Sequence, residues 1–322
     1  MEIVAESQVR PADAAAVSEA ARLLRAGKLV AFPTETVYGL GADATNDHAV
    51  ADIFAAKKRP RFNPLIVHVA GLDHAEDYGQ FDAMARKLTA AFWPGALTLV
   101  LPRRTGCTLS QLVSAGLDTV ALRVPAHSVA RELLAKSGRP IAAPSANASG
   151  RVSATSAEHV LKSLGGKVEL ILDAGPTTLG LESTVIGFDA ATPVLLRTGA
   201  ISRSDIENVV GRLKDPTKAG VRSPGQLASH YAPRASVRLN VGSVRQDEAL
   251  LAFGPEIPLG AKVTVNLSEK GDVREAAVNL FAHLHTLDAT GLPIAVMPIP
   301  RGGLGEAIND RLARAAAARD KP

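Results

Sequence analysis

Cysteine is almost absent from this chain of 322 residues, which holds Cys107 alone. A single cysteine excludes a disulfide framework within the chain, and no cysteine–histidine spacing typical of a zinc site occurs. Aromatic residues make up only 4% of the sequence, which argues against a surface that stacks on many unpaired bases. No apolar run reaches the roughly 18 residues of a membrane-spanning helix, and the opening stretch "MEIVAESQVRPADAAAV" does not resemble a signal peptide. We therefore expect a soluble, reduced, cytoplasmic protein without membrane contact.

Motifs for covalent and metal-dependent catalysis are also missing. The sequence holds no G-x-x-x-x-G-K-[S/T], H-E-x-x-H or G-x-S-x-G pattern. The glycines of Gly39-x-Gly41-x-x-Ala44 resemble a dinucleotide-binding fingerprint, but the acid expected about 20 residues later falls in a basic cluster. The remaining residues favour catalysis by positioning and charge neutralisation.

Apolar content and net charge indicate the size of the core and the kind of partner that the protein could bind. With 46% hydrophobic residues, the chain is long enough for a sizeable core and two domains. A net charge of +4 and a pI near 9.3 fit an anionic partner without demonstrating one.

Helical patterns mixed with short apolar strands predict an α/β sheet in residues 1–210, with late neighbouring strands pairing antiparallel. Residues 211–235 are expected to form a linker, and residues 236–322 a small second α/β domain.

Four cations gather within five positions at the start of "KKRPRFNPLIVHVA", residues 57–70. The end of a predicted helix explains one or two of them, since cations stabilise that end. Pro60 and Pro64 fix the path of the segment, so that its cations suit a polyphosphate, to which arginine can bind through two N–H groups. Taken alone, the cluster also fits a nucleic-acid backbone or a solvated surface. We expect Lys58 and Arg61 to face solvent.

Polar side chains recur at the ends of other apolar strands. His68 lies in "LIVHV" on the same face as Ile66, although a lone strand histidine is more often a satisfied core residue. Arg123 in "TVALRVP" needs a carboxylate from the protein or from a ligand, because an unpaired buried guanidinium is costly. The stretches "APSANASG", "LESTVIGF" and "LLRTGAIS" add hydroxyls, amides and Arg197. Several such groups at one sheet edge would indicate a ligand site.

The order of these motifs resembles that of the YrdC-like domain family. The matching stretches are "FPTETVYGLGADA", "KKRPRFNPLIVHV", "FWPGALTLVL", "LRVPAH", "APSANASG", "ESTVI" and "LLRTGAI". Two further stretches, "SPGQLASHYAP" and "GLGEAINDRLARAA", resemble the longer members of the family, the L-threonylcarbamoyladenylate synthases. The resemblance implies a YrdC-like twisted mixed sheet with helices, followed by a smaller C-terminal Rossmann-like α/β domain.

The resemblance also implies a nucleotidyltransferase. Such an enzyme converts L-threonine, bicarbonate and ATP into threonylcarbamoyl-AMP and pyrophosphate. The product serves N6-threonylcarbamoyladenosine formation at position 37 of tRNAs that read ANN codons. Mg2+ would neutralise the pyrophosphate, and the product would pass to a tRNA threonylcarbamoyl transferase complex.

Site residues are carried over by the same resemblance, with Lys57 and Arg59 as the catalytic cations and no metal-binding residue. Those expected on ATP are Lys57, Arg59, Asn63, Thr119, Ser145, Asn147, Ser153, Arg197, His230 and Tyr231. Those expected on L-threonine are Thr34, Thr36, His68, Arg123, Ala143 and Ser183, with Arg123 on the carboxylate. The linker that carries His230 and Tyr231 is expected to act as a lid.

An RNA-binding module is the main alternative. The basic concave surface associated with YrdC-like folds would then make weak, salt-dependent contacts with RNA and turn over no ATP. Low aromatic content and polar strand ends favour the enzyme. A carbamoyl-transferring domain of a larger maturation enzyme would need zinc-finger-like cysteines and a second catalytic module, and this sequence has neither.

Overall fold

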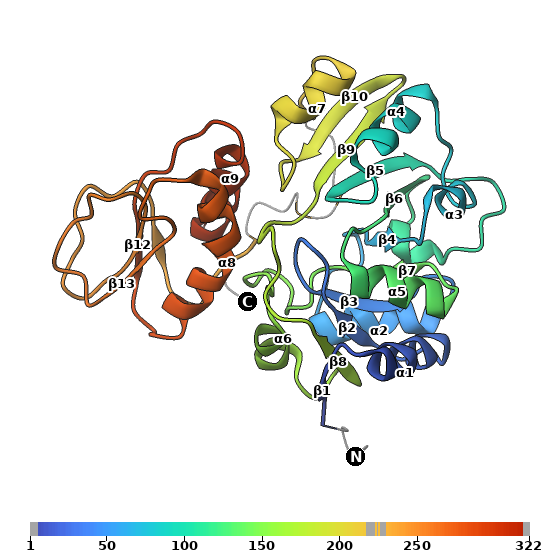
Figure 1. Ribbon diagram of the computed structural model, residues 1–322, viewed down its shortest axis with the longest axis horizontal. Helices are drawn as coiled ribbons and strands as arrows, with labels where there is room; N and C mark the ends of the chain where they lie inside the picture. Colours follow the sequence, from blue (N-terminus) through green and yellow to red (C-terminus); the bar gives the residue numbers. More distant parts are fainter. Residues whose placement is uncertain (1–5, 217–222, 224, 226–229, 318–322) are drawn as a thin grey trace.

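The computed structural model describes residues 6–216, 223, 225 and 230–317. The predicted linker, 211–235, therefore falls partly outside the described residues. Figure 1 shows a larger body built around one β-sheet and a smaller body, drawn in orange and red, built around another. The chain passes once from the first sheet to the second, as the predicted order of two α/β units requires.

The larger sheet follows the order β1-β8-β2-β3-β7-β4-β6-β5-β9-β10. Its strands are β1 (Gln8–Pro11), β2 (Val30–Phe32), β3 (Gly39–Asp43), β4 (Ile66–His68), β5 (Leu97–Pro102), β6 (Thr119–Arg123), β7 (Ile141–Ala142), β8 (Leu170–Asp173), β9 (Thr184–Asp189) and β10 (Thr192–Arg197). Parallel pairs such as β4 with β6 lie beside antiparallel pairs such as β5 with β6. The predicted mixed sheet is confirmed.

The late strands follow the prediction only in part. Neighbouring β9 and β10 pair antiparallel, as expected of a hairpin. Strand β8 instead lies parallel between β1 and β2. Residues 174–183 separate β8 from β9, and a connection of that length lets the chain cross to another part of the sheet.

Helices flank this sheet, and they begin and end near the residues that the sequence indicates. They are α1 (Ala14–Arg25), α2 (Asp47–Lys57), α3 (Leu72–Glu76), α4 (Ala83–Phe92), α5 (Ser128–Ser137), α6 (Ala157–Leu164) and α7 (Arg203–Val210), with a 3-10 turn, η1 (Gln111–Ser114). The Asp13 side chain accepts the Ala16 N–H at 2.7 Å and caps α1, as predicted. Helix α2 ends at Lys57, and Lys58 after it adopts a left-handed conformation.

Alternate residues of the central strands pack on opposite faces of the larger sheet. Val67 and Leu122 belong to the main core, which includes the buried apolar residues of α2 and α4. Ile66 and Ala121 belong to a smaller cluster on the other face. His68 follows Ile66 on that second face, as the two-residue alternation predicts. This is the face that carries the pocket described below.

The smaller sheet is parallel throughout its order, β11-β14-β12-β13. Its strands are β11 (Val237–Arg238), β12 (Ala249–Ala252), β13 (Val263–Asn266) and β14 (Ile294–Val296), and its helices are α8 (Val273–Asp288) and α9 (Gly305–Ala316). Leu251 and Val296 pack against the helices, whereas Leu250 and Ala295 pack under Val244 and other loop residues. The parallel sheet agrees with the Rossmann-like prediction, but both of its helices cover the same face.

Helices α8 and α9 lie between the smaller sheet and the larger body (Figure 1). The rings of His159 on α6 and His285 on α8 stack with centroids 3.9 Å apart, and His285 Nε2 donates to the Ser153 carbonyl at 3.0 Å. Gly180 approaches α8 so closely that a Cβ would lie 2.3 Å from the Val278 carbonyl oxygen. The two bodies are therefore tightly packed against each other. Within the described ranges, no helix is long and apolar enough to cross a membrane.

Candidate active site

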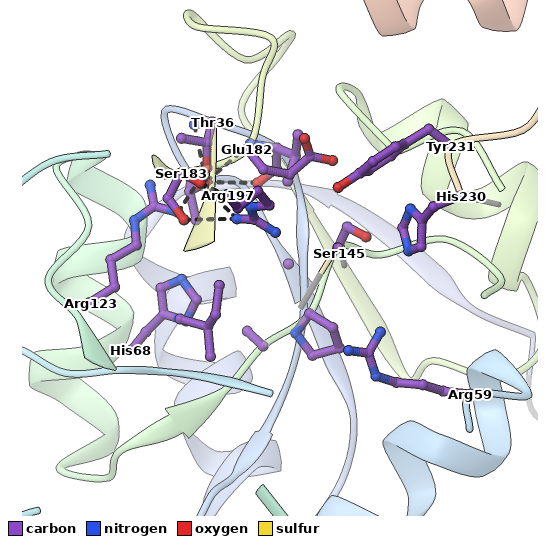
Figure 2. Close-up of a pocket in the computed structure, with 17 residues that line it drawn as sticks. Thr36, Arg59, His68, Arg123, Ser145, Glu182, Ser183, Arg197, His230 and Tyr231 are labelled. Atoms are coloured by element: carbon purple, nitrogen blue, oxygen red, sulfur yellow. Dashed lines mark hydrogen bonds between the residues drawn. The ribbon is translucent and has the colours of Figure 1, made fainter. Parts of the chain in front are cut away.

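A pocket lies on the face of the larger sheet that carries Ile66 and His68 (Figure 2). Strand ends, the loops that follow them and the end of the linker form its walls. The lining residues are Thr34, Thr36, Val37, Gly39, Arg59, Ile66, His68, Arg123, Ala143, Pro144, Ser145, Glu182, Ser183, Arg197, Gly225, His230 and Tyr231. Many of the predicted polar groups therefore converge on one pocket over this face of the sheet.

Arg123 forms a buried ion pair at one end of this pocket. Its Nη2 lies 2.6 Å from Glu35 Oε1, and both side chains are at most 10% exposed. Its Nη1 donates to Thr36 Oγ1 at 2.9 Å, and its Nε donates to the Gly95 carbonyl at 3.1 Å. Burial raises the pKa of Glu35, but the charge and hydrogen bond of Arg123 outweigh it and leave that pKa below its ordinary value. The protein itself therefore supplies the carboxylate that the position of Arg123 requires.

His68 stands beside Arg123 and is 3% exposed. Its Nδ1 has no hydrogen-bond partner in the described part of the chain. Burial, with a further contribution from the charge of Arg123, lowers the pKa of His68 to about 3. The imidazole is therefore neutral near pH 7. A neutral imidazole in the lining of a pocket is suited to hydrogen bonding with a ligand.

Arg59 lies near the opposite end of the pocket, where Ser145 and Tyr231 also point inward (Figure 2). Its Nε and Nη2 donate to the carbonyl oxygens of Asn63 at 3.1 Å and Pro64 at 2.8 Å. No carboxylate among the described residues forms an ion pair with it. Burial lowers the pKa of Arg59 to about 10, and the charge of Arg197 contributes to that shift. An anionic ligand would stabilise this guanidinium.

Lys57 is buried but does not line the pocket. Its Nζ donates to the carbonyl oxygens of Ser145 and Asn147, and so holds the loop after β7. Burial, followed by the charge of Arg59, lowers the pKa of Lys57 well below its ordinary value. Lys58 and Arg61 are exposed, as predicted. The basic cluster therefore divides into a ligand-facing arginine, a loop-holding lysine and two solvated cations.

Replacement of Lys57 by methionine tests this loop-holding role. The change would leave the buried carbonyl oxygen of Asn147 and the partly buried one of Ser145 without their donor. An unsatisfied buried group costs about 1–3 kcal/mol. We expect the free energy of unfolding to fall by about 2 kcal/mol and ATP to bind more weakly as Ser145 moves. Urea unfolding and calorimetric titration would measure both, with the exposed Lys58→Met variant as control. Equal stability of the two variants would contradict the assignment.

Arg197 and Ser183 join two strands at the wall of the pocket. Arg197 donates from Nε and Nη2 to the Ser183 carbonyl at 3.1 and 2.8 Å, and from Nη2 to Ser183 Oγ at 3.1 Å. Ser183 Oγ also lies 2.7 Å from Thr98 Oγ1. These bonds fix the direction in which the serine hydroxyl and the guanidinium face the pocket.

Glu182 is the one acid among the described residues that line the pocket. It accepts hydrogen bonds from Ser153 Oγ and from Arg311 Nε, the latter at 2.9 Å. Burial raises its pKa, but the charges of Arg311 and Arg197 outweigh that effect and leave the pKa below its ordinary value. Glu182 is therefore ionised and held in place from two sides.

His230 and Tyr231 close one side of the pocket from the linker (Figure 2). Tyr231 is 1% exposed and has a φ of 59°, a left-handed conformation that is unusual for a tyrosine. The His230 N–H donates to the Arg314 carbonyl at 3.3 Å, while His230 Nδ1 has no partner among the described residues. Burial, then the charges of Arg59 and Lys57, lower the pKa of His230 well below its ordinary value. This neutral imidazole therefore stands in a cationic environment.

Most residues predicted to bind a ligand line this pocket: Thr34, Thr36, Arg59, His68, Arg123, Ala143, Ser145, Ser183, Arg197, His230 and Tyr231. Others lie behind it. Ser153 binds Glu182, and the Asn147 amide donates to the carbonyl oxygens of Ala148 and Arg151. The Asn63 side-chain amide is buried without a partner in the described part of the chain.

Thr119 lies at the other end of its strand from the pocket. It begins β6, whereas Arg123 ends that strand at the pocket. Four residues of extended strand span roughly 13 Å, and Thr119 pairs with Pro102 on β5. It does not line the pocket, and its contact with the nucleotide stays a prediction.

Three charged residues of the site are absent from the sequence prediction: Glu35, Glu182 and Arg311. Glu35 and Glu182 stand inside quoted motifs, but acids of that kind are common beside loops. Arg311 carries a clearer signal, because it falls on the same helical face as Ile308 and Leu312. An arginine at a core position of an amphipathic helix predicts buried carboxylate partners.

Two family models match this chain. Residues 22–199 match one described as "Telomere recombination", and residues 201–317 match one described as "Threonylcarbamoyl-AMP synthase, C-terminal domain". Over 319 residues the chain is 44% identical to the threonylcarbamoyl-AMP synthase of Pyrococcus abyssi, which covers 92% of both proteins. The chain belongs to the threonylcarbamoyl-AMP synthase family. It is also 41% identical over 325 residues to the Bacillus subtilis member, with 94% of this chain and 93% of the relative covered. The predicted family is confirmed, and it is a family of enzymes.

Solved structures agree with this assignment. The fold matches P. abyssi Sua5 complexed with L-threonine at a TM-score of 0.86 and 40% identity, over 93% of this chain and 94% of the other. It also matches, at a TM-score of 0.85 and 38% identity over 93% and 92% of the two chains, a variant of that protein. In that variant a histidine and the tyrosine after it are replaced by alanine. This chain contains one His–Tyr dipeptide, at His230–Tyr231.

Proposed function

We propose that this chain is a threonylcarbamoyl-AMP synthase that forms threonylcarbamoyl-AMP and pyrophosphate from L-threonine, bicarbonate and ATP. The observation that carries the proposal is the charge pattern of the pocket. Arg59 and Arg197 line the pocket, and Lys57 is buried outside its lining. Burial together with the neighbouring cations lowers the pKa of each of the three below its ordinary value. A bound triphosphate would supply the negative charge that this group requires.

The two ends of the pocket suit the two larger substrates. L-Threonine would lie against His68, Arg123 and Ser183. A guanidinium has five N–H groups, and three of those of Arg123 bind described residues. With respect to these residues, two remain for the threonine carboxylate. ATP would lie toward Arg59 and Ser145, with Arg197 between the two substrates.

The reaction then needs few groups from the protein. The threonine amine captures bicarbonate or CO2 to form a carbamate, and a carbamate oxygen attacks the α-phosphorus as pyrophosphate leaves. Arg59 and Arg197 would stabilise the charge that develops on the phosphoryl oxygens. His68 is neutral because its pKa is about 3, so it can hydrogen-bond the threonine amine without repelling it. His230 and Tyr231 would exclude water from the unstable carbamate.

Magnesium is part of the proposed substrate rather than a resident cofactor. In the described ranges no group of three or more metal-ligating side chains occurs. Glu182, the acid of the pocket, already binds Ser153 and Arg311. Mg2+ usually binds such sites through substrate phosphates, and we propose that it arrives on ATP. We also propose a cytoplasmic location and transfer of the product to a tRNA threonylcarbamoyl transferase complex.

A pyrophosphate-release assay tests the function. With ATP and Mg2+ present, we expect release that requires both L-threonine and bicarbonate. Omission of threonine should reduce the rate to background, and mass spectrometry should detect threonylcarbamoyl-AMP in the complete mixture. Release that is independent of threonine, or no release at all, would reject the proposal.

A further inference from the structure

Arg311 joins the smaller body to the wall of the pocket. It belongs to α9 and is completely buried. Its Nε donates to Glu182 Oε2 at 2.9 Å, and its Nη2 donates to the Thr198 carbonyl at 2.7 Å. Its Nη1 donates to Asp310 Oδ2 at 2.6 Å. One guanidinium of the smaller body therefore binds two separate segments of the larger one.

Those two segments carry residues that face the ligand. Glu182 precedes Ser183 at the start of β9, and Thr198 follows Arg197 at the end of β10. The backbones meet at Gly199, where a Cβ would lie 2.5 Å from the Glu182 carbonyl oxygen. Because Arg311 holds the side chain of one segment and the carbonyl of the other, it fixes how they meet.

The same guanidinium also packs against the ring of Tyr231. Its Cζ lies 4.8 Å from the centre of the tyrosine ring, in a cation–π contact. Phe281 of α8 stacks with that ring at a centroid distance of 5.7 Å and an interplanar angle of 28°. Helices α8 and α9 therefore position the aromatic side chain by which the linker closes the pocket.

Stability alone is a weak explanation for this arginine. Its neighbours on the buried face of α9, Ile308 and Leu312, are apolar. An apolar side chain at such a position is often as stable as a buried ion pair or more so, because burial of charges costs desolvation energy. What an apolar side chain would lack is the set of directed hydrogen bonds to Glu182 and Thr198.

We propose that Arg311 is a positioning residue of the synthase site, through which the C-terminal domain orients the Glu182–Ser183 and Arg197 wall together with Tyr231. The inference rests on the proposed function, and it assigns a role to the second domain within the reaction. Arg311 itself does not line the pocket. Its effect on substrates is therefore carried by the residues that it holds.

The test compares Arg311→Met with Arg238→Met in the full-length protein. Arg238 also belongs to the smaller body and pairs with the buried Glu248 at 2.6 Å, but it touches none of the pocket residues. Pyrophosphate release is measured at a temperature at which circular dichroism shows each variant to be folded. We expect Arg311→Met to raise KM for both ATP and L-threonine about tenfold, the loss of about 1.4 kcal/mol of binding. Arg238→Met should leave both KM values unchanged.

Measurement of KM separates a positioning role from a loss of folded protein. A loss of folded protein lowers the apparent kcat but leaves KM unchanged. The KM values of Arg311→Lys should lie between those of the wild type and Arg311→Met. Lysine can pair with Glu182, but it lacks the planar guanidinium that also donates to the Thr198 carbonyl. If Arg311→Met does not fold, an unchanged KM in Arg311→Lys overturns the inference. An equal rise in KM for Arg238→Met and Arg311→Met also overturns it. Inactive wild-type protein would instead reject the proposed function.

Discussion

Replacement of Arg59 by alanine is expected to abolish threonine-dependent pyrophosphate release. Arg59 lines the pocket and donates hydrogen bonds to two carbonyl oxygens. Among the described residues, no carboxylate pairs with it. Its charge is therefore available to the triphosphate. Removal of one fixed donor that stabilises developing charge typically lowers turnover by about 100- to 1,000-fold. Steady-state kinetics with varied ATP would show both a lower kcat and a higher KM.

Arg61→Ala is the matched control for this prediction. Arg61 lies two positions further along the same basic cluster, but it is exposed and its charge is solvated. We expect its kinetics to equal those of the wild type. If Arg59→Ala and Arg61→Ala behave alike, the cluster has no specific role at the site. If both weaken RNA binding with a strong dependence on salt, the basic surface serves nucleic acid instead.

Replacement of Arg123 by methionine is expected to damage both stability and threonine binding. The variant leaves the Glu35 carboxylate buried without its cation, and removal of one partner of a buried ion pair costs about 3–5 kcal/mol. It also removes the two N–H groups proposed for the threonine carboxylate. A lost charge-assisted hydrogen bond contributes about 1.5–3 kcal/mol, so KM for threonine should rise at least about tenfold. Urea unfolding and threonine titration measure the two effects separately.

The double variant Glu35→Gln with Arg123→Met separates these roles. It removes both charges, and a buried ion pair replaced by neutral groups is often nearly as stable as before. We expect it to recover most of the lost stability while threonine binding stays weak. Recovery of threonine binding along with stability would show that Arg123 is purely structural. Arg22→Met, which breaks the exposed pair with Glu19, should leave the stability nearly unchanged, because solvent screens exposed ion pairs.

Local features of the fold were predictable because their causes lie within a few residues. Asp13 caps α1 as its spacing predicts, and His68 shares a face with Ile66 because side chains alternate along a strand. Exposure of Lys58 and Arg61 was also predicted correctly. The sequence did not predict that Lys57 holds a loop whereas Arg59 faces the pocket, because this difference depends on the residue at which α2 ends. Lys58 there adopts a left-handed φ of 52°, which separates two cations that stand only two positions apart.

The sequence by itself determined the family, the alternation of strands and helices, and most of the side chains that line the pocket. Only the tertiary structure decided how their charges are paired. Glu35 reaches Arg123 across 88 positions, and Arg311 reaches Glu182 across 129. Such pairs depend on sheet order and on the packing of one body against the other, and no pattern of neighbouring residues encodes either. The same physical reason explains why the contribution of the second domain to the site becomes visible only in the folded protein.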